Sequence, residues 1–199
     1  MFVKVCGLST ASDVAAAVDA GADAVGFVVA PSPRQIDLAT VRELVPAAGE
    51  RMTVLLTVDA TASELLEMAA VAGVTAVQPY GAHSAGAGVA AATSGLFVLR
   101  PIPVGDRLVG LDSIPDDQLP LFDTRVAGLH GGTGVSFDWS LLEAIERDFV
   151  LAGGLGPDTV ADAIARVHPW GVDASSGLES SPGRKDHGRI RAFVEGARQ

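Results

Sequence analysis

Short apolar runs alternate with helix-forming segments along the whole chain, and this alternation constrains the fold more than any other feature. Eight such runs are typical of buried strands, and they cover residues 3–6, 24–30, 53–58, 74–77, 96–99, 119–122, 149–152 and 171–174. Strands that alternate with helices pair in parallel through right-handed crossovers. Eight units are typical of a closed (β/α)8 barrel, whereas an open flavodoxin-like sheet needs only about five. We therefore expect a single barrel domain over residues 1–199, near the lower size limit of about 200 residues.

Capping signals place helices between these strands. Thr10, Asp37 and Thr61 are candidate N-caps, and Gly21 and Gly73 are candidate stops. Helices are expected at residues 14–20, 37–45, 62–72 and 186–197, and a weak one at residues 84–93 because Gly86 and Gly88 lie inside it.

Three further helices are weaker expectations. Residues 104–114 could form only a short, poor helix, so the fifth helix of the barrel is expected to be short or degenerate. Another helix should begin after Asp138 or Ser140 and run through Ile145, and the next should carry Pro157 in its first turn.

Composition limits the classes of function. The formal net charge of −10 disfavours nonspecific binding to nucleic acid or to an anionic membrane. No apolar run approaches the roughly 18 residues of a membrane span, and the N-terminus shows no export signal. One cysteine and four scattered histidines provide neither an internal disulfide nor a metal-ligand pattern. We expect a cytoplasmic protein without a bound metal, present as a monomer or homodimer.

Two reactive side chains are expected at the mouth of the barrel, where such folds place their chemistry. Cys6 ends the first predicted strand and Asp123 ends the sixth, so they could face each other across the mouth. A thiolate base and a carboxyl acid on opposite sides of one substrate suit an isomerase. The thiolate requires surroundings that lower the thiol pKa well below about 8.5. The alternatives are a buried apolar role for Cys6 and a turn or capping role for Asp123.

Two loops of small residues are candidates for binding an anion. Gly153 and Gly154 follow the seventh predicted strand, and Ser175, Ser176 and Gly177 follow the eighth. Barrels often bind phosphate after these two strands, with backbone amides and hydroxyl groups as donors. We therefore expect a phosphorylated small-molecule substrate, with ordinary turns as the alternative.

Two charged residues and a third loop complete the candidate site. Arg34 follows two prolines and could bind a carboxylate through two parallel hydrogen bonds, or it could be an ordinary surface residue. Asp173 lies one residue before the end of the eighth strand, as a hydrogen-bond acceptor at the core edge or a substrate ligand. The glycine-rich segment 131–134 adds exposed backbone amides after Asp123.

With these motifs in place, the chain resembles the phosphoribosylanthranilate isomerases of tryptophan biosynthesis. The matching segments follow one another along the whole chain: Lys-Val-Cys-Gly-Leu at 4–8, Gly-Ala-Asp-Ala-Val-Gly-Phe at 21–27, Pro-Ser-Pro-Arg at 31–34, Leu-Phe-Asp-Thr at 121–124, Gly-Gly-Thr-Gly at 131–134 with Phe-Asp-Trp at 137–139, Leu-Ala-Gly-Gly-Leu at 151–155, Gly-Val-Asp-Ala-Ser-Ser-Gly-Leu-Glu at 171–179, and Ser-Pro-Gly at 181–183 with Lys-Asp at 185–186.

The resemblance implies an Amadori rearrangement of N-(5-phosphoribosyl)anthranilate to 1-(2-carboxyphenylamino)-1-deoxyribulose 5-phosphate. By this similarity Asp123 is the general acid that protonates the ribose ring oxygen, and Cys6 is the general base that removes the C2 proton. Arg34 would hold the anthranilate carboxylate, Asp173 would line the anthranilate side, and the two small-residue loops would hold the phosphate. No cofactor is implied, because the substrate nitrogen serves as the electron sink.

The chain departs from the family pattern in two mouth loops. Residues 78–81 read Gln-Pro-Tyr-Gly where the family usually has Gln-Leu-His-Gly, and Val135 replaces the family's lysine. Three alternatives therefore remain: a related phosphoribosyl isomerase, a paralogue with an altered substrate, and a catalytically silent phosphate-binding barrel. Cys6 argues against the histidine-pathway isomerase, because that enzyme family uses an aspartate as the base on its first strand.

Overall fold

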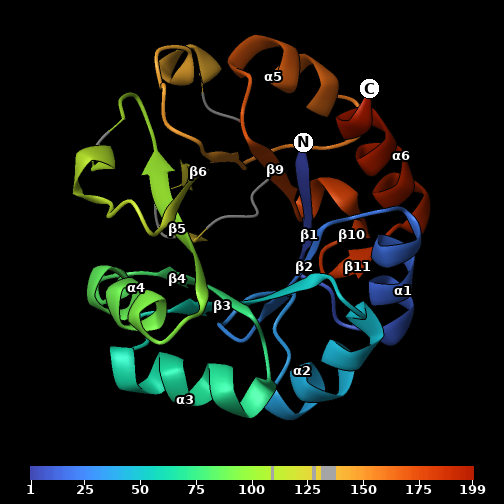
Figure 1. Ribbon diagram of the computed structural model, residues 1–199. Helices are drawn as coiled ribbons and strands as arrows, with labels where there is room; N and C mark the ends of the chain where they lie inside the picture. Colours follow the sequence, from blue (N-terminus) through green and yellow to red (C-terminus); the bar gives the residue numbers. More distant parts are fainter. Residues whose placement is uncertain (109, 127–128, 131–137) are drawn as a thin grey trace.

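Eight parallel strands close into a barrel in the computed structural model, which describes residues 1–108, 110–126, 129–130 and 138–199. The barrel strands among these residues are β1 (Phe2–Cys6), β2 (Ala24–Val28), β3 (Met52–Val58), β4 (Ala76–Tyr80), β5 (Phe97–Val104), β6 (Leu119–Val126), β8 (Val150–Leu151) and β9 (Gly171–Ala174). Each strand pairs in parallel with the next, β6 pairs with β8, and β9 returns to pair with β1. Figure 1 shows the helices arranged around the outside of this ring. The expected (β/α)8 barrel is confirmed.

The helices begin and end largely where the capping signals indicated. Those in the described part of the chain are α1 (Ala11–Asp19), α2 (Leu38–Leu44), α3 (Ala62–Ala72), α4 (Ser84–Thr93), α5 (Val160–Val167) and α6 (His187–Arg198). Four N-cap side chains accept a hydrogen bond from the backbone N–H three residues later: Thr10, Asp37, Thr61 and Asp186. Gly73 ends α3 in the left-handed region, with φ of 71°, where glycine carries no steric penalty.

The fifth helix of the barrel is degenerate, as expected, but the short helix placed over residues 104–114 is replaced among the described residues by the end of a strand and a 3-10 turn. β5 continues through Pro101 and Pro103 to Val104, and in the described residues that follow, only the 3-10 turn Leu111–Ser113 lies within that range. β6 pairs with β5 up to its last residue, whereas β4 pairs only with the first two residues of β5. At the two prolines β5 therefore has a partner strand on one side only, and an N–H that is missing from the unpaired side costs no hydrogen bond.

Two more helices differ from expectation. The segment after Asp138 forms only a 3-10 helix, Trp139–Leu142, and the expected helix that runs through Ile145 does not form. After this helix Arg147 donates to three backbone carbonyls of the connection that precedes β6. α5 begins only after Thr159, so Pro157 lies in the turn before the helix.

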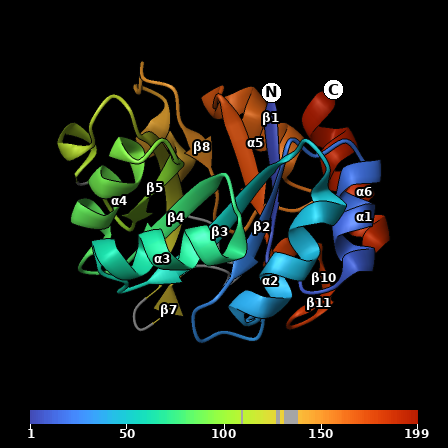
Figure 2. The same cartoon turned by 60° about the horizontal axis from the view of Figure 1, so that its bottom comes forward.

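β6 is longer than the apolar run indicated. It continues past Phe122 to Val126, so Asp123 lies within the strand and not after it. A short strand, β7 (Leu129–His130), pairs antiparallel with the end of β6. β7 and the pair β10 (Glu179–Ser181) and β11 (Arg184–Lys185) lie at the end of the barrel opposite the N-terminus (Figure 2). The glycine-rich segment 131–134 and Val135 lie outside the described residues.

The strand period of two separates an inner layer from an outer one. One apolar cluster lies inside the barrel and contains Ala24, Val54, Ala76, Leu99, Leu121, Val150 and Ala152. The larger cluster lies between strands and helices, and it contains Val3 and Val5 of β1. Because successive side chains point to opposite faces, Lys4 and Cys6 face the interior, as does Asp123, two residues after Leu121.

Candidate active site

A cavity of ≈ 710 Å³ lies at the carboxyl ends of the strands. Its wall is built from the last inward-facing residues of most barrel strands and from the loops that follow β2, β8 and β9. Eight of the nine residues expected in the site line it: Cys6, Arg34, Asp123, Gly153, Gly154, Asp173, Ser175 and Ser176. The fold thus gathers side chains that are up to 170 residues apart in sequence.

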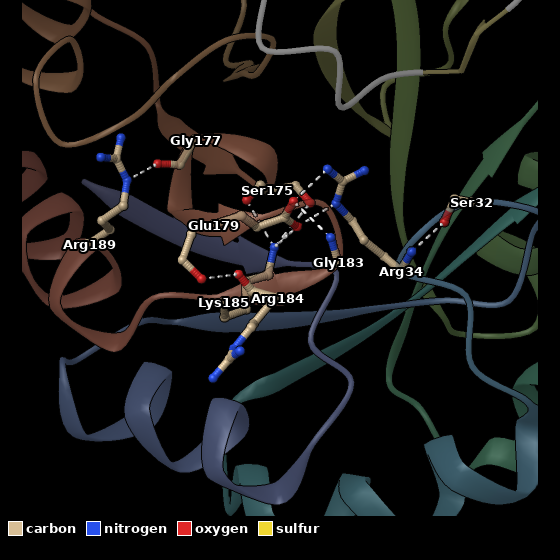
Figure 3. A network of polar contacts seen from close by, with 10 residues as sticks. Ser32, Arg34, Ser175, Gly177, Glu179, Gly183, Arg184, Lys185 and Arg189 are labelled. Carbon is tan, nitrogen blue, oxygen red and sulfur yellow. Dashed lines mark hydrogen bonds and ion pairs between the residues drawn. The ribbon is translucent and has the colours of Figure 1, made fainter.

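Gly177 has a packing role, and it is not among the described residues that line the cavity. A Cβ atom at this position would lie 2.0 Å from the Leu155 carbonyl oxygen, so a side chain cannot fit. The Gly177 carbonyl accepts a hydrogen bond of 2.8 Å from Arg189 Nε (Figure 3). Gly177 therefore joins the loops after β8 and β9, and only its neighbours Ser175 and Ser176 reach the cavity.

Cys6 lies on the cavity floor as a buried thiol, only 3% exposed. A Cβ atom on Gly26, its partner on β2, would lie 2.7 Å from Cys6 Sγ, so glycine leaves room for the sulfur. Burial raises the pKa of the thiol above its ordinary value, and the nearby Lys4 ammonium opposes this effect. The surroundings therefore do not lower the pKa as thiolate formation at neutral pH would require.

Lys4 is a completely buried lysine that was not singled out from the sequence. Its Nζ lies 2.8 Å from Asp173 Oδ2, and both side chains are at most 7% exposed. Burial lowers the pKa of Lys4, but the charges of Asp173 and of a Cys6 thiolate outweigh it and raise the net value. Asp173 thus has an internal cation as partner, directly beneath the cavity.

Asp123 is buried on the opposite wall, 7% exposed. Tyr80 Oη donates to its Oδ2 at 2.9 Å, and the Thr124 backbone N–H donates to its Oδ1 at 2.8 Å. Burial raises the pKa of Asp123 to about 6, with the hydrogen bonds from Tyr80 and Thr124 opposing the rise and Asp173 adding to it. A carboxyl group with this pKa keeps a useful protonated fraction near neutral pH.

Arg34 is held by an internal carboxylate. Its Nε and Nη2 donate to Glu179 Oε1 and Oε2 at 2.6 and 2.9 Å, the bidentate geometry expected for this side chain but with Glu179 as the partner. Lys185 Nζ also contacts Glu179 Oε1 at 2.8 Å, and Figure 3 shows the carboxylate between the two cations. Burial raises the pKa of Glu179, but the hydrogen bonds from Arg34 and Lys185 hold it below its ordinary value.

Glycines make the close packing of these loops possible. Gly7 has φ of 73°, and a Cβ there would lie 2.6 Å from Arg34 Cδ and 2.8 Å from Ser175 Oγ. Gly153 and Gly154 also have positive φ, 83° and 72°. A Cβ on Gly153 would lie 2.2 Å from Thr124 Oγ1, so the loop after β8 sits directly on the residue that follows Asp123.

The described residues contain no group of three or more His, Cys, Asp or Glu side chains that could hold a metal ion. None of the helices described here is long and apolar enough to cross a membrane.

Residues 3–196 match the family model described as N-(5'phosphoribosyl)anthranilate (PRA) isomerase. The chain belongs to the PRA isomerase family. It is 41% identical over 199 residues to an N-(5'-phosphoribosyl)anthranilate isomerase of Pseudomonas fluorescens, covering 98% of this chain and 97% of the relative. The family inferred from the motifs is thereby confirmed, and with it an isomerase of tryptophan biosynthesis.

Two solved PRA isomerase structures have the same fold. One is a complex with reduced 1-(o-carboxyphenylamino)-1-deoxyribulose 5-phosphate, with a TM-score of 0.82 and 31% identity over 100% of this chain and 98% of the other. The second contains monomers of the dimeric enzyme from Thermotoga maritima, with a TM-score of 0.82 and 30% identity over the same shares.

Sequence reasoning assigned no role to four polar residues around the cavity: Lys4, Tyr80, Glu179 and Lys185. Lys4 carried a usable signal, because it is the one charged residue in an apolar strand and lies two positions before Cys6 on the same face. Glu179 and Lys185 lay inside matched PRA isomerase segments without an assigned role. Tyr80 was noted only as a departure from the family pattern.

Proposed function

We propose that this protein catalyses the rearrangement of N-(5-phosphoribosyl)anthranilate to 1-(2-carboxyphenylamino)-1-deoxyribulose 5-phosphate, with Asp123 as general acid and Cys6 as general base. The observation that carries the proposal is that a carboxyl group with a pKa of about 6 and a buried thiol line one cavity from β6 and β1. An acid and a base presented from different strands can act on two atoms of one bound substrate.

The reaction divides into two proton transfers. Asp123 gives its proton to the ribose ring oxygen while the C1–O bond breaks, and the nitrogen lone pair forms the C1–N double bond of an open-chain iminium ion. The Cys6 thiolate then removes the C2 proton, and the C–H electrons form a C1–C2 double bond as the nitrogen regains its lone pair. The resulting enol tautomerises to the ketone. The substrate nitrogen accepts and returns the electrons, so no cofactor takes part.

The charge state of Cys6 limits the second transfer. Burial raises the pKa of the thiol, the ammonium group of Lys4 lowers it, and the charges of Asp173 and Lys185 raise and lower it respectively. The active form therefore combines a protonated Asp123 with a deprotonated Cys6, which is a minor fraction of the free enzyme at any pH. Because the carboxyl group has the lower pKa of the two, we expect a bell-shaped pH profile in which the acidic limb has its midpoint at the pKa of Asp123 and the alkaline limb at the pKa of Cys6.

Substrate binding is proposed at the two ends of the cavity. The loops at Gly153–Gly154 and Ser175–Ser176 hold the phosphate, while Arg34 and Asp173 lie on the anthranilate side. Arg34 and Lys185 carry two positive charges against one negative charge on Glu179, so the cluster retains one net positive charge for a substrate carboxylate. The carboxylate then shares Arg34 with Glu179 instead of meeting an unpaired guanidinium.

Genetic complementation tests the activity. The gene should restore growth without tryptophan to a strain that lacks this isomerase, and should not restore a histidine auxotroph that lacks the corresponding enzyme. A purified protein that binds the reduced product analogue but never turns over substrate would instead support a catalytically silent barrel. We further propose that the chain forms one domain and acts in the cytoplasm as a monomer or homodimer, which sedimentation would distinguish.

The matched variants Cys6→Ala and Cys6→Ser test the base. Both should lose nearly all turnover while binding the reduced product analogue within about tenfold of wild type, because proton abstraction acts on the transition state. Activity of Cys6→Ala within a few-fold of wild type would show that the thiol is a packing residue.

A further inference from the structure

Three side chains form a continuous hydrogen-bonded chain across the cavity, from β4 to β6. Gln78 Nε2 donates to Tyr80 Oη at 2.9 Å, and Tyr80 Oη donates to Asp123 Oδ2 at 2.9 Å. Gln78 and Tyr80 are two positions apart on β4, so both face the interior. All three residues line the cavity. Asp123, the acid of the proposed reaction, is thus hydrogen-bonded to Tyr80, a residue without a role in the two proton transfers.

The two oxygens of Asp123 differ in their partners. Oδ1 accepts from the Thr124 backbone N–H at 2.8 Å, a donor that cannot reverse its direction. Oδ2 faces the Tyr80 hydroxyl, whose hydrogen can rotate and which can also accept a hydrogen bond. A proton on the carboxyl group therefore belongs on Oδ2, because a proton on Oδ1 would oppose the fixed N–H.

Gln78 allows the chain to run in either direction. Its Oε1 is buried and has no hydrogen-bond partner among the described residues, and the side chain is 1% exposed. The two ends of a glutamine amide exchange places by a half-turn. With the amide turned, Asp123 Oδ2–H donates to Tyr80 Oη, and Tyr80 O–H donates to Gln78 Oε1. The unpartnered oxygen then has a donor when Asp123 carries its proton.

We propose that Tyr80, oriented by Gln78, is the positioning residue for the acid: it keeps the Asp123 proton on Oδ2 and stabilises the carboxylate once that proton has left. The inference rests on the proposed function, in which Asp123 protonates the ring oxygen. As the Oδ2–H bond breaks and a new O–H bond forms on the substrate, the tyrosine hydroxyl turns back to donate to Oδ2. A hydrogen bond to a carboxylate is stronger than one to a neutral acid, so this contact strengthens towards the transition state.

Tyr80 stands where the family usually has histidine, and the two side chains differ in charge behaviour. A histidine titrates near neutral pH, whereas burial and the charges of Asp123 and Asp173 raise the pKa of Tyr80 well above its ordinary value. The partner of Asp123 therefore stays neutral throughout the working range. Among the described residues, the charges of Asp173 on β9 and Lys4 on β1 also act on Asp123, in opposite directions.

Tyr80→Phe is the decisive variant, because it keeps the ring and removes only the hydroxyl. Loss of the hydrogen bond to the carboxylate should raise the pKa of Asp123 and so move the acidic limb of the kcat profile up by roughly one pH unit. At the pH optimum kcat should fall by about tenfold, with KM within about threefold. Gln78→Leu should shift the limb in the same direction by less, because Tyr80 then keeps its hydroxyl but loses its orientation. An unmoved limb in Tyr80→Phe, or a rise in KM alone, would overturn the proposal.

A titration that needs no turnover separates this inference from the proposed function. The Asp123 carboxyl carbon can be followed by 13C NMR against pH in Cys6→Ala, with Asp123→Asn used to assign the signal. The midpoint should rise when Tyr80→Phe is added, and circular dichroism should show both proteins folded. An unchanged midpoint contradicts the role of Tyr80 whatever the activity. A raised midpoint in a protein whose wild type never turns over substrate would leave the hydrogen-bonded chain standing and refute the isomerase function.

Discussion

Lys4 and Asp173 are direct partners across the seam where β1 meets β9, and their side chains form a buried ion pair with Nζ 2.8 Å from Oδ2. Both side chains lie inside the barrel, and Lys4 is two residues before Cys6 on the same face of β1. The pair places a positive charge beneath the thiol and fixes one oxygen of Asp173, while Asp173 Oδ1 has no hydrogen-bond partner in the described residues. Stability and reactivity are therefore coupled at this seam.

Lys4→Met should destabilise the protein by about 3–5 kcal/mol, because it leaves Asp173 buried without its cation. It should also raise the thiol pKa further and move the alkaline limb of the kcat profile to higher pH, since Lys4 opposes the effect of burial on Cys6. Urea unfolding and a pH profile would measure the two effects. The control is Lys4→Met with Asp173→Leu, which should regain much of the stability but not the activity.

The pair should also give stability a marked pH dependence at the alkaline end. The pKa of Lys4 is raised in the folded state above its ordinary 10.5, so its contribution is complete below 10.5. The contribution is lost as pH rises through the higher folded value. Urea midpoints should fall more steeply above that pH in wild type than in the Lys4→Met, Asp173→Leu protein, and parallel curves would contradict this.

Asp123→Asn should lower kcat by roughly 10²-fold or more and yet stabilise the protein at neutral pH. The folded pKa of about 6 against the ordinary 3.8 means that ionising Asp123 costs about 3 kcal/mol above pH 6. A neutral amide avoids much of this cost, so we expect a gain of about 1–3 kcal/mol at pH 7 that disappears near pH 4. Thermal unfolding at the two pH values would show it. A loss of stability at pH 7 would mean that the hydrogen bonds outweigh burial.

Arg34→Lys should raise KM by about tenfold or more with a smaller effect on kcat, because lysine keeps the charge but not the planar pair of donors. The matched variant Glu179→Gln keeps Arg34 and removes the carboxylate that orients it, so it tests orientation separately from charge. Steady-state kinetics of both would decide. An unchanged KM in Arg34→Lys would place the anthranilate carboxylate elsewhere.

Gly154→Asp should weaken binding of phosphorylated ligands, since its carboxylate would oppose the phosphate. Gly154 has φ of 72°, so any side chain there is strained, and Gly154→Ala is the control for that strain. The difference between the two variants should appear for the reduced product analogue and vanish for the same compound without its phosphate. Equal affinities of both variants for the phosphorylated compound would move the phosphate site away from this loop.

The apolar period of the strands and the position of each residue along its strand sufficed to predict the barrel and the places of Cys6 and Asp123. They could not predict the Lys4–Asp173 pair, which depends on the register of two strands 169 residues apart. The Arg34–Glu179 pair is equally non-local, because a loop after β2 meets a hairpin after β9. The length of β5 was predicted wrongly for another reason. A proline in the sequence indicates the end of a strand, unless it is known that no neighbouring strand pairs with the side on which its N–H is missing.

Closure of the barrel by its first and last strands has a consequence for synthesis of the chain. The ribosome releases β1 early, but its neighbour β9 becomes available only after residue 174 has left the exit tunnel. Until then Lys4 lacks its counterion, and an ammonium without a partner resists transfer into an apolar interior. The first strand should therefore remain solvated while the middle of the barrel assembles. The thiol and the ion pair beneath it would be completed together, only once β9 has joined the barrel.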